Sequence, residues 1–208
     1  MSSNEDDMSH VYNPYWADIY AKGNTGVFWD VVDFPIPECD PDMISKKIKS
    51  ALEDKGCYNG PVSIRLYQDE KNIIPTKKQE LIDKYEAAGI STNFVPEVAE
   101  AYIHARVHKM LVDILFWALD NPAHSNLIIL SKNLKDKETV SNLQALHWSG
   151  TNVLLAEPVS EDLPFTESSA WLWSRLCESL SSDGAGSSQD TTVAVYKLES
   201  KSEEEASV

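Results

Sequence analysis

Gly26–Pro37 reads GVFWDVVDFPIP, and this segment sets the expected architecture. Its first half is apolar and aromatic, which favours a buried β-strand. Two aspartates, Asp30 and Asp33, follow this run, and Pro35 and Pro37 prevent the chain from continuing as a central strand or a helix. We therefore expect Asp30 where a strand leaves its sheet. In open α/β sheets, ligands and metals bind at the edge formed by such strand ends.

The rest of the chain alternates between strand and helix patterns. Together with the first strand, apolar runs predict a sheet of about five strands, and helical patterns separate them. Such alternation predicts an α/β fold with a central parallel sheet and helices on both faces. The expected strands are 26–31, 62–69, 91–96, 126–133 and 151–158, and the expected helices are 42–56, 76–89, 103–122, 135–150 and 168–180.

The chain divides into three parts by composition. We expect a partly disordered N-terminal extension at 1–24, one α/β domain at 25–180, and a disordered acidic, serine-rich tail at 181–208. Asp42 is expected near the start of the first helix, and Thr76 is expected to be the N-cap of the second. Gly56, Gly89 and Gly150 are expected at helix ends.

Charge and cysteine content exclude several classes of protein. The chain has 33 acids and 18 bases, a net charge of −15, which argues against a general phosphate-binding surface. Its three cysteines are widely spaced, which suits a reducing compartment better than a disulfide scaffold or a zinc knuckle. No secretory signal is evident, and no segment reaches the ~20 apolar residues of a membrane span. We expect an intracellular, cytoplasmic protein without a membrane partner.

Acidic residues follow several of the predicted strands. Carboxylates gathered at one edge of a parallel sheet can hold Mg²⁺ or Mn²⁺ for phosphodiester hydrolysis. The alternative is that these acids cap helices and keep the surface soluble. The candidates are Asp30, Asp33, Asp69, Asp113 and Asp136.

Four stretches of the sequence resemble one family. GVFWDVVDFPIP, LYQD with NIIP, KMLVDILFWALDNPAHSNLIILS, and TNVLLAEP with AWLWSRL are similar to segments of NYN domains of the limkain, or meiosis regulator and mRNA stability factor, type. The third stretch is closest to plant versions. The resemblance covers about 26 to 178 and implies a three-layer, PIN-like (Rossmann-like) fold. It also implies an Mg- or Mn-dependent ribonuclease that acts in RNA metabolism and the control of gene expression, linked in animals to peroxisomes.

The resemblance also implies positions for the metal ligands. Asp30 matches the first metal aspartate of the family, and Asp33 stands beside it as a polar substitute. The aspartate that the family carries on its long helix falls on Val107. The two acids that follow the fourth strand fall on Asn133 and Lys135, an amide and a cation.

These departures predict a degenerate metal site. A divalent cation needs several oxygen ligands, and a nearby lysine repels it. If the chain cleaves RNA, Asp30 is expected to be the main metal ligand, with Asp33 and Asp136 as further catalytic residues. Asp136 lies one residue beyond the family position, on a helix start, and Asp113 matches the family but lies on an apolar helix face.

Two readings of the function therefore stay open. The first is a ribonuclease with weakened or lost hydrolysis, in which Asp69, Lys71 and Asn133 contact single-stranded RNA. The second is a non-catalytic pseudonuclease that binds RNA or a protein partner. A glycosidase is less consistent with the sequence, because Asp30 and Asp33 share one short turn and no aromatic sugar platform is evident. His104 and His108 have zinc-like spacing, but no third ligand is apparent.

Overall fold

The structure, a computed structural model, describes residues 19–70, 75–96, 102–121, 124–157 and 168–183. Strands and helices alternate along this part of the chain, as the sequence pattern predicts. Their order is β1 (Thr25–Asp30), α2 (Pro41–Asp54), β2 (Val62–Asp69), α3 (Pro75–Ala87), β3 (Ile90–Val95), α4 (Tyr102–Asp120), β4 (Asn126–Leu130), α5 (Lys137–Trp148), β5 (Asn152–Leu155) and α6 (Ala170–Asp183).

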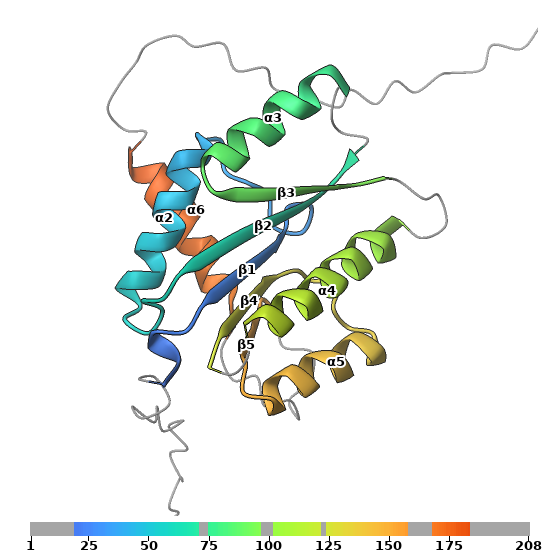
Figure 1. The fold of residues 1–208 in the computed structure, drawn as a ribbon. Coiled ribbons are helices and arrows are strands. Elements are labelled where there is room, and N and C mark those ends of the chain that lie inside the picture. The colour runs from blue at the N-terminus through green and yellow to red at the C-terminus, as the bar shows by residue number, and fades with distance from the viewer. Residues whose placement is uncertain (1–18, 71–74, 97–101, 122–123, 158–167, 184–208) are drawn as a thin grey trace, which may run out of the picture.

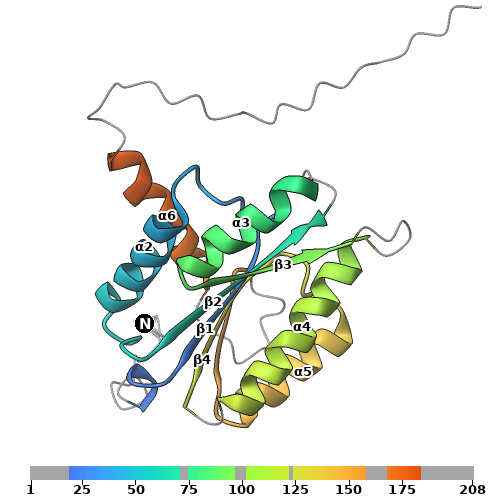
Figure 2. The ribbon, with the colours of Figure 1, turned by 45° about the horizontal axis from the view of Figure 1, so that its top comes forward.

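The five strands form one sheet, and every pair of neighbours runs parallel. Their order is β3-β2-β1-β4-β5, so β1 lies in the middle. Helices α2, α3 and α6 lie on one face of the sheet, and α4 and α5 cover the other (Figures 1 and 2). The predicted parallel sheet with helices on both faces is confirmed.

The side chains of β1 alternate between two hydrophobic cores, because successive residues of a strand point to opposite faces. Val27 and Trp29 belong to the core under α2 and α6, whereas Phe28 belongs to the core under α4. Gly26 lies on the α4 side, where a Cβ would come within 2.8 Å of the ring of Trp117. The absence of a side chain at this position therefore lets α4 pack directly against the sheet.

Several element ends differ from the sequence-based expectation. Asp42 lies in the first turn of α2, as expected, and Asp40 caps this helix: its side chain accepts a hydrogen bond from the backbone N–H of Asp42. Thr76 lies inside α3, because the helix already includes Pro75, a residue suited to a first turn. Strand β4 ends at Leu130, and residues 131–133 form a loop at the site edge.

The predicted terminal segments lie largely outside the described residues. Residues 1–18 and 184–208 are not described, whereas α6 extends to Asp183, into the segment expected to form the tail. None of the helices that are described is both long and apolar enough to cross a bilayer.

The sheet order determines where a site can form. From β1 the chain passes through α2 to β2 on one side, and only later reaches β4 on the other side of β1. The carboxyl ends of β1 and β4 therefore meet at a topological switch point, the usual ligand position in this class of sheet. Asp30 ends β1 at this edge.

Candidate functional site

The ends of β1 and β2 bring two aspartates to the same face of the sheet. Asp30 pairs in register with Tyr67, and Asp69 follows Tyr67 by two residues, so Asp69 and Tyr67 point to the same side. This side is the one that α4 covers, since Tyr67 belongs to the core beneath that helix. Both carboxylates are buried, with 0% of Asp30 and 3% of Asp69 exposed.

A single arginine from α4 bridges these two acids. Nε of Arg106 donates to both carboxylate oxygens of Asp30, at 2.8 Å each, and Nη1 donates to Oδ1 of Asp69 at 2.8 Å. Arg106 is itself only 1% exposed. A backbone N–H, that of Val32, donates a further hydrogen bond to Asp30 at 3.0 Å. We refer to Asp30, Asp69 and Arg106 together as the arginine bridge.

Burial and charge oppose each other in the arginine bridge. Burial raises the pKa of the Asp30 carboxyl above its usual value, and the guanidinium of Arg106 offsets part of this shift. Burial alone would lower the pKa of Arg106, but its hydrogen bonds to Asp30 and the charges of both acids outweigh burial and raise it. The guanidinium is therefore positively charged at any working pH, and it supplies the countercharge that the buried carboxylates need.

A second group of hydrogen bonds surrounds Asp33, on the β4 side of Asp30. The backbone N–H of Lys132 donates to Asp33 Oδ2 at 2.7 Å, and the Ser131 hydroxyl donates to the same oxygen at 3.1 Å. Nδ2 of Asn133 donates to both oxygens, at 2.9 and 3.0 Å. We call Asp33 and residues 131–133 the Asp33 cluster. It ties the loop after β1 to the loop after β4 across the switch point.

Asp113, the helix acid that matches the family, is also paired. Its carboxylate accepts a hydrogen bond from the Tyr67 hydroxyl at 2.9 Å, and Lys109 Nζ lies 2.6 Å from both oxygens. Burial, together with the charge of Asp113, raises the pKa of Tyr67. Asp113 thus anchors α4 to β2, and its hydrogen bonds are directed at groups within the fold.

The other residues singled out in the sequence lie around these groups. Val107 is buried in the core under α4. Lys135 Nζ lies 3.3 Å from a carboxylate oxygen of Glu157. Asp136 caps α5 by accepting a hydrogen bond from the backbone N–H of Thr139 at 2.8 Å. Hydrogen bonding to the Thr139 side chain, and then to its backbone N–H, lowers the pKa of Asp136. Lys71 lies outside the described residues, as does the side chain of His104, and His108 is exposed.

A family comparison identifies this arrangement. The family model of the NYN domain matches residues 24–169. The chain belongs to the NYN family. The match begins beside β1 and ends at the start of α6, so it includes all five strands and both acid groups. Comparison with curated proteins gives no match. NYN domains are PIN-like domains of ribonuclease type, and their nucleases generally depend on divalent metal ions.

In this NYN domain, the acids at the sheet edge do not fit a divalent cation. The guanidinium of Arg106 already occupies the space between Asp30 and Asp69, and it carries a positive charge that repels a metal ion. Asp33 accepts hydrogen bonds from groups within the fold, and Asp136 caps a helix. Within the described ranges, no three His, Cys, Asp or Glu side chains are placed to hold a metal. We therefore derive no chemical step through a metal.

Arg106 is the functional residue that reasoning from the sequence missed. The resemblance described above directed attention to the neighbouring residue, Val107, as the expected position of a metal aspartate. A helical pattern does contain the missing information: Arg106, Met110, Ile114 and Trp117 recur at intervals of four and three, and all four are buried. A charged residue on the inward stripe of a helix needs a buried partner, and the acids at the strand ends are the nearest expected source.

Proposed function

We propose that this chain is a non-cleaving NYN domain of the limkain type, which acts in RNA metabolism by binding single-stranded RNA. The arginine bridge carries the proposal. In a metal-dependent nuclease, strand-end acids hold a cation that activates water and stabilises the phosphoryl charge. Here the same kind of edge holds a cation that belongs to the chain and activates no water.

The geometry of Arg106 supports loss of cleavage more directly than the missing acids do. Its side chain is 1% exposed, so a phosphodiester cannot reach the guanidinium. Asp30 is fully buried and already accepts three hydrogen bonds, two from Arg106 and one from Val32. A general base must come within hydrogen-bond reach of the group that it deprotonates. Asp30 does not meet that condition.

Retention of RNA binding is supported by the surface of the same edge. Lys132 is exposed, and its Nζ lies 5.2 Å from the ring centroid of Phe34, a residue in the loop that follows β1. A lysine at this place can meet a phosphate of a strand that crosses the switch point. Because the chain carries a net charge of −15, we expect binding to be local, weak and strongly dependent on salt.

A cleavage assay tests the first half of the proposal. Labelled single-stranded RNA is incubated with the wild-type protein or with the Asp30→Asn variant in the presence of Mn²⁺. Circular dichroism checks that both proteins are folded. We expect both proteins to give the same background. Cleavage by wild type that disappears in Asp30→Asn would show an active nuclease and overturn the proposal.

A binding assay tests the second half. The binding of a short labelled RNA is measured by fluorescence anisotropy for wild type and for the Lys132→Glu variant. Lys55→Glu, at the C-terminal end of α2, is the control on the other face of the sheet. We expect Lys132→Glu to weaken binding and the control to leave it nearly unchanged. If wild type shows no saturable binding at low salt, the RNA half is wrong, and the protein-binding reading takes its place.

A further inference from the structure

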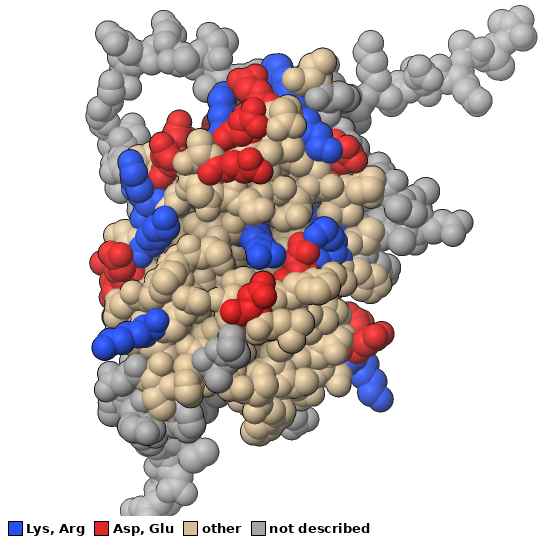
Figure 3. Space-filling model, viewed as in Figure 1, with Lys and Arg blue, Asp and Glu red and all other residues tan. Residues whose placement is uncertain are grey.

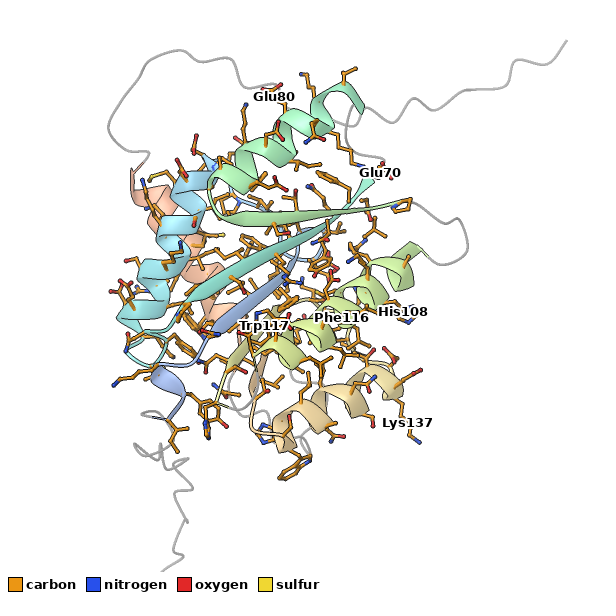
Figure 4. The ribbon with its side chains drawn as sticks, viewed as in Figure 1. Glu70, Glu80, His108, Phe116, Trp117 and Lys137 are labelled. Carbon is orange, nitrogen blue, oxygen red and sulfur yellow. The ribbon has the colours of Figure 1, made fainter. Side chains whose placement is uncertain are left out.

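Helix α4 carries an apolar stripe on the side that faces away from the sheet. Val112, Phe116 and Leu119 are separated by four and three residues, so they lie on one face of the helix. Their exposed fractions are 46%, 63% and 76%. Trp117, the neighbour of Phe116, is in contrast buried against the sheet (Figure 4). We call Val112, Phe116 and Leu119 the α4 stripe.

The surroundings of the α4 stripe are poor in charge. Lys, Arg, Asp and Glu crowd the α2 and α3 side of the molecule, whereas the surface over α4 and α5 is mostly uncharged (Figure 3). Trp148, the last residue of α5, is 77% exposed. The C-terminal ends of α4 and α5 lie at the same end of the helical layer (Figure 1). Exposed apolar residues in such a group mark an interaction surface rather than isolated surface side chains.

The charges at the two ends of the α4 stripe have opposite sign. Lys109 precedes the stripe and pairs with Asp113 of the same helix, but 46% of its side chain is exposed, so its ammonium can also meet a second acid. Asp120 follows the stripe at the end of α4. Asp120 adds negative charge to a helix end that is already negative, and the last turn of α4 contains no basic residue. Among the described residues, Asp120 has no ion-pair partner.

We propose that the α4 stripe is a self-association surface, on which a second copy of this chain packs its own α4 antiparallel about a two-fold axis near Phe116. This arrangement brings Val112 of one copy opposite Leu119 of the other, and the two Phe116 rings together at the centre. By the rise of ~1.5 Å per residue, Lys109 then lies within one helical turn of Asp120 of the second copy. An isologous contact makes both charge pairs at once.

The second copy fits this surface better than RNA does. RNA is a polyanion, and an apolar stripe that ends in an acid has few groups that could bind its phosphates. The charge order along α4 is complementary to itself only when the second helix is reversed, and the antiparallel orientation also pairs opposite helix dipoles. The exposed side chains cover less than the ~800 Å² per partner of a standard interface, so we expect a dissociation constant on the order of 1–100 µM.

Sedimentation velocity of the full chain over a concentration series tests the proposal. We expect a monomer–dimer equilibrium in wild type, and at least ~30-fold weaker association in Phe116→Glu, since a central aromatic residue contributes most to such a contact. Met43→Glu is the matched control, because Met43 is 38% exposed on α2, on the other face of the sheet. The control is expected to dimerise as wild type does. Both substituted residues are exposed, and circular dichroism checks that each variant folds.

A charge exchange tests the antiparallel orientation. Asp120→Lys places two positive charges together in the proposed dimer and is expected to weaken it at low salt. The double variant Lys109→Glu with Asp120→Lys restores opposite signs between the copies and is expected to recover part of the loss. Lys109→Glu alone, which also removes the Lys109–Asp113 ion pair, is the control for the effect of that pair on folding and association. A monomeric wild type at about 200 µM, above the expected range of dissociation constants, would overturn the proposal. A dimer that Phe116→Glu leaves intact would overturn it as well.

Discussion

The arginine bridge and the Asp33 cluster stabilise two carboxylates near the end of β1 in different ways. Each surrounds a carboxylate at the end of β1, and each replaces what would be metal contacts with hydrogen bonds from the chain. Asp30, fully buried beside a second acid, is met by a full positive charge from Arg106. Asp33, partly exposed, is met by a hydroxyl, a backbone N–H and the amide of Asn133. Burial therefore decides whether a charge or a dipole is needed.

The comparison also shows what the neighbours of each carboxylate supply. Asn133 can donate to Asp33, which an acid at that position could not do when ionised. Arg106 gives Asp30 and Asp69 a structural role even where they serve no chemistry, because its buried guanidinium donates hydrogen bonds to both carboxylates. Retention of Asp30 is thus consistent with loss of cleavage.

Removing the charge of Arg106 should have the largest effect. Arg106→Met keeps much of the side-chain volume but leaves two buried carboxylates without a countercharge, and we expect a loss of about 3–5 kcal/mol in unfolding free energy. Urea unfolding followed by circular dichroism measures this difference. Arg106→Lys, which keeps the charge but not the two-sided geometry, should lie between Arg106→Met and wild type.

The pH dependence of the Arg106→Met variant sharpens this prediction. Burial already raises the pKa of Asp30, and without Arg106 the pKa rises further, above that in the unfolded chain. The folded state then binds a proton that the unfolded state releases, so stability falls as pH increases through this range. We expect the difference from wild type to be smaller at about pH 5 than at about pH 8, and an equal loss at both values would contradict the charge explanation.

Changing Asn133 should have an intermediate effect. Asn133→Asp replaces a donor by a second carboxylate next to Asp33, and we expect a loss of about 1–3 kcal/mol that lessens as pH falls and one acid is protonated. Asn133→Ala removes the donor without adding charge and separates the two contributions. If Asn133→Asp is as stable as wild type at neutral pH, Asp33 does not depend on the loop after β4 as described.

The smallest effect is expected at Asp136, outside both groups. Asp136→Ala removes the cap of α5 and should cost about 1 kcal/mol, the usual value for such a cap. Its pKa is lowered in the folded chain, so this contribution is present at neutral pH and disappears as pH falls through that lowered pKa. RNA binding should be unchanged. Weaker RNA binding in this variant would place Asp136 in a site rather than in a cap.

Reasoning from the sequence predicted the fold class and most of the strands and helices, but not the arginine that contacts the candidate site. The segment 62–69 predicts β2 to the residue, and the apolar run around Phe28 predicts a strand buried on both faces, because periodicity and turn residues determine these features locally. The placement of Asp30, Asp69 and Asn133 at one edge follows from parallel topology alone. Whether Asp30 is available to a ligand or already paired depends on Arg106, which lies 76 positions away in the sequence. The helical pattern places Arg106 on the buried face of α4, but it does not identify Asp30 as the partner.

The most direct test of the account is the thermal unfolding of wild type and Arg106→Ala, each with and without Mn²⁺. We expect no shift in wild type, because the guanidinium already occupies the space between Asp30 and Asp69. In Arg106→Ala, about 5 mM Mn²⁺ should raise the midpoint by about 2–4 °C, the shift that corresponds to ~1 kcal/mol of ligand stabilisation in a chain of this size. Adding Asp30→Asn to that variant should abolish the gain. Stabilisation of wild type by Mn²⁺ that is lost in Asp30→Asn would show that a metal, rather than Arg106, is the cation of this site.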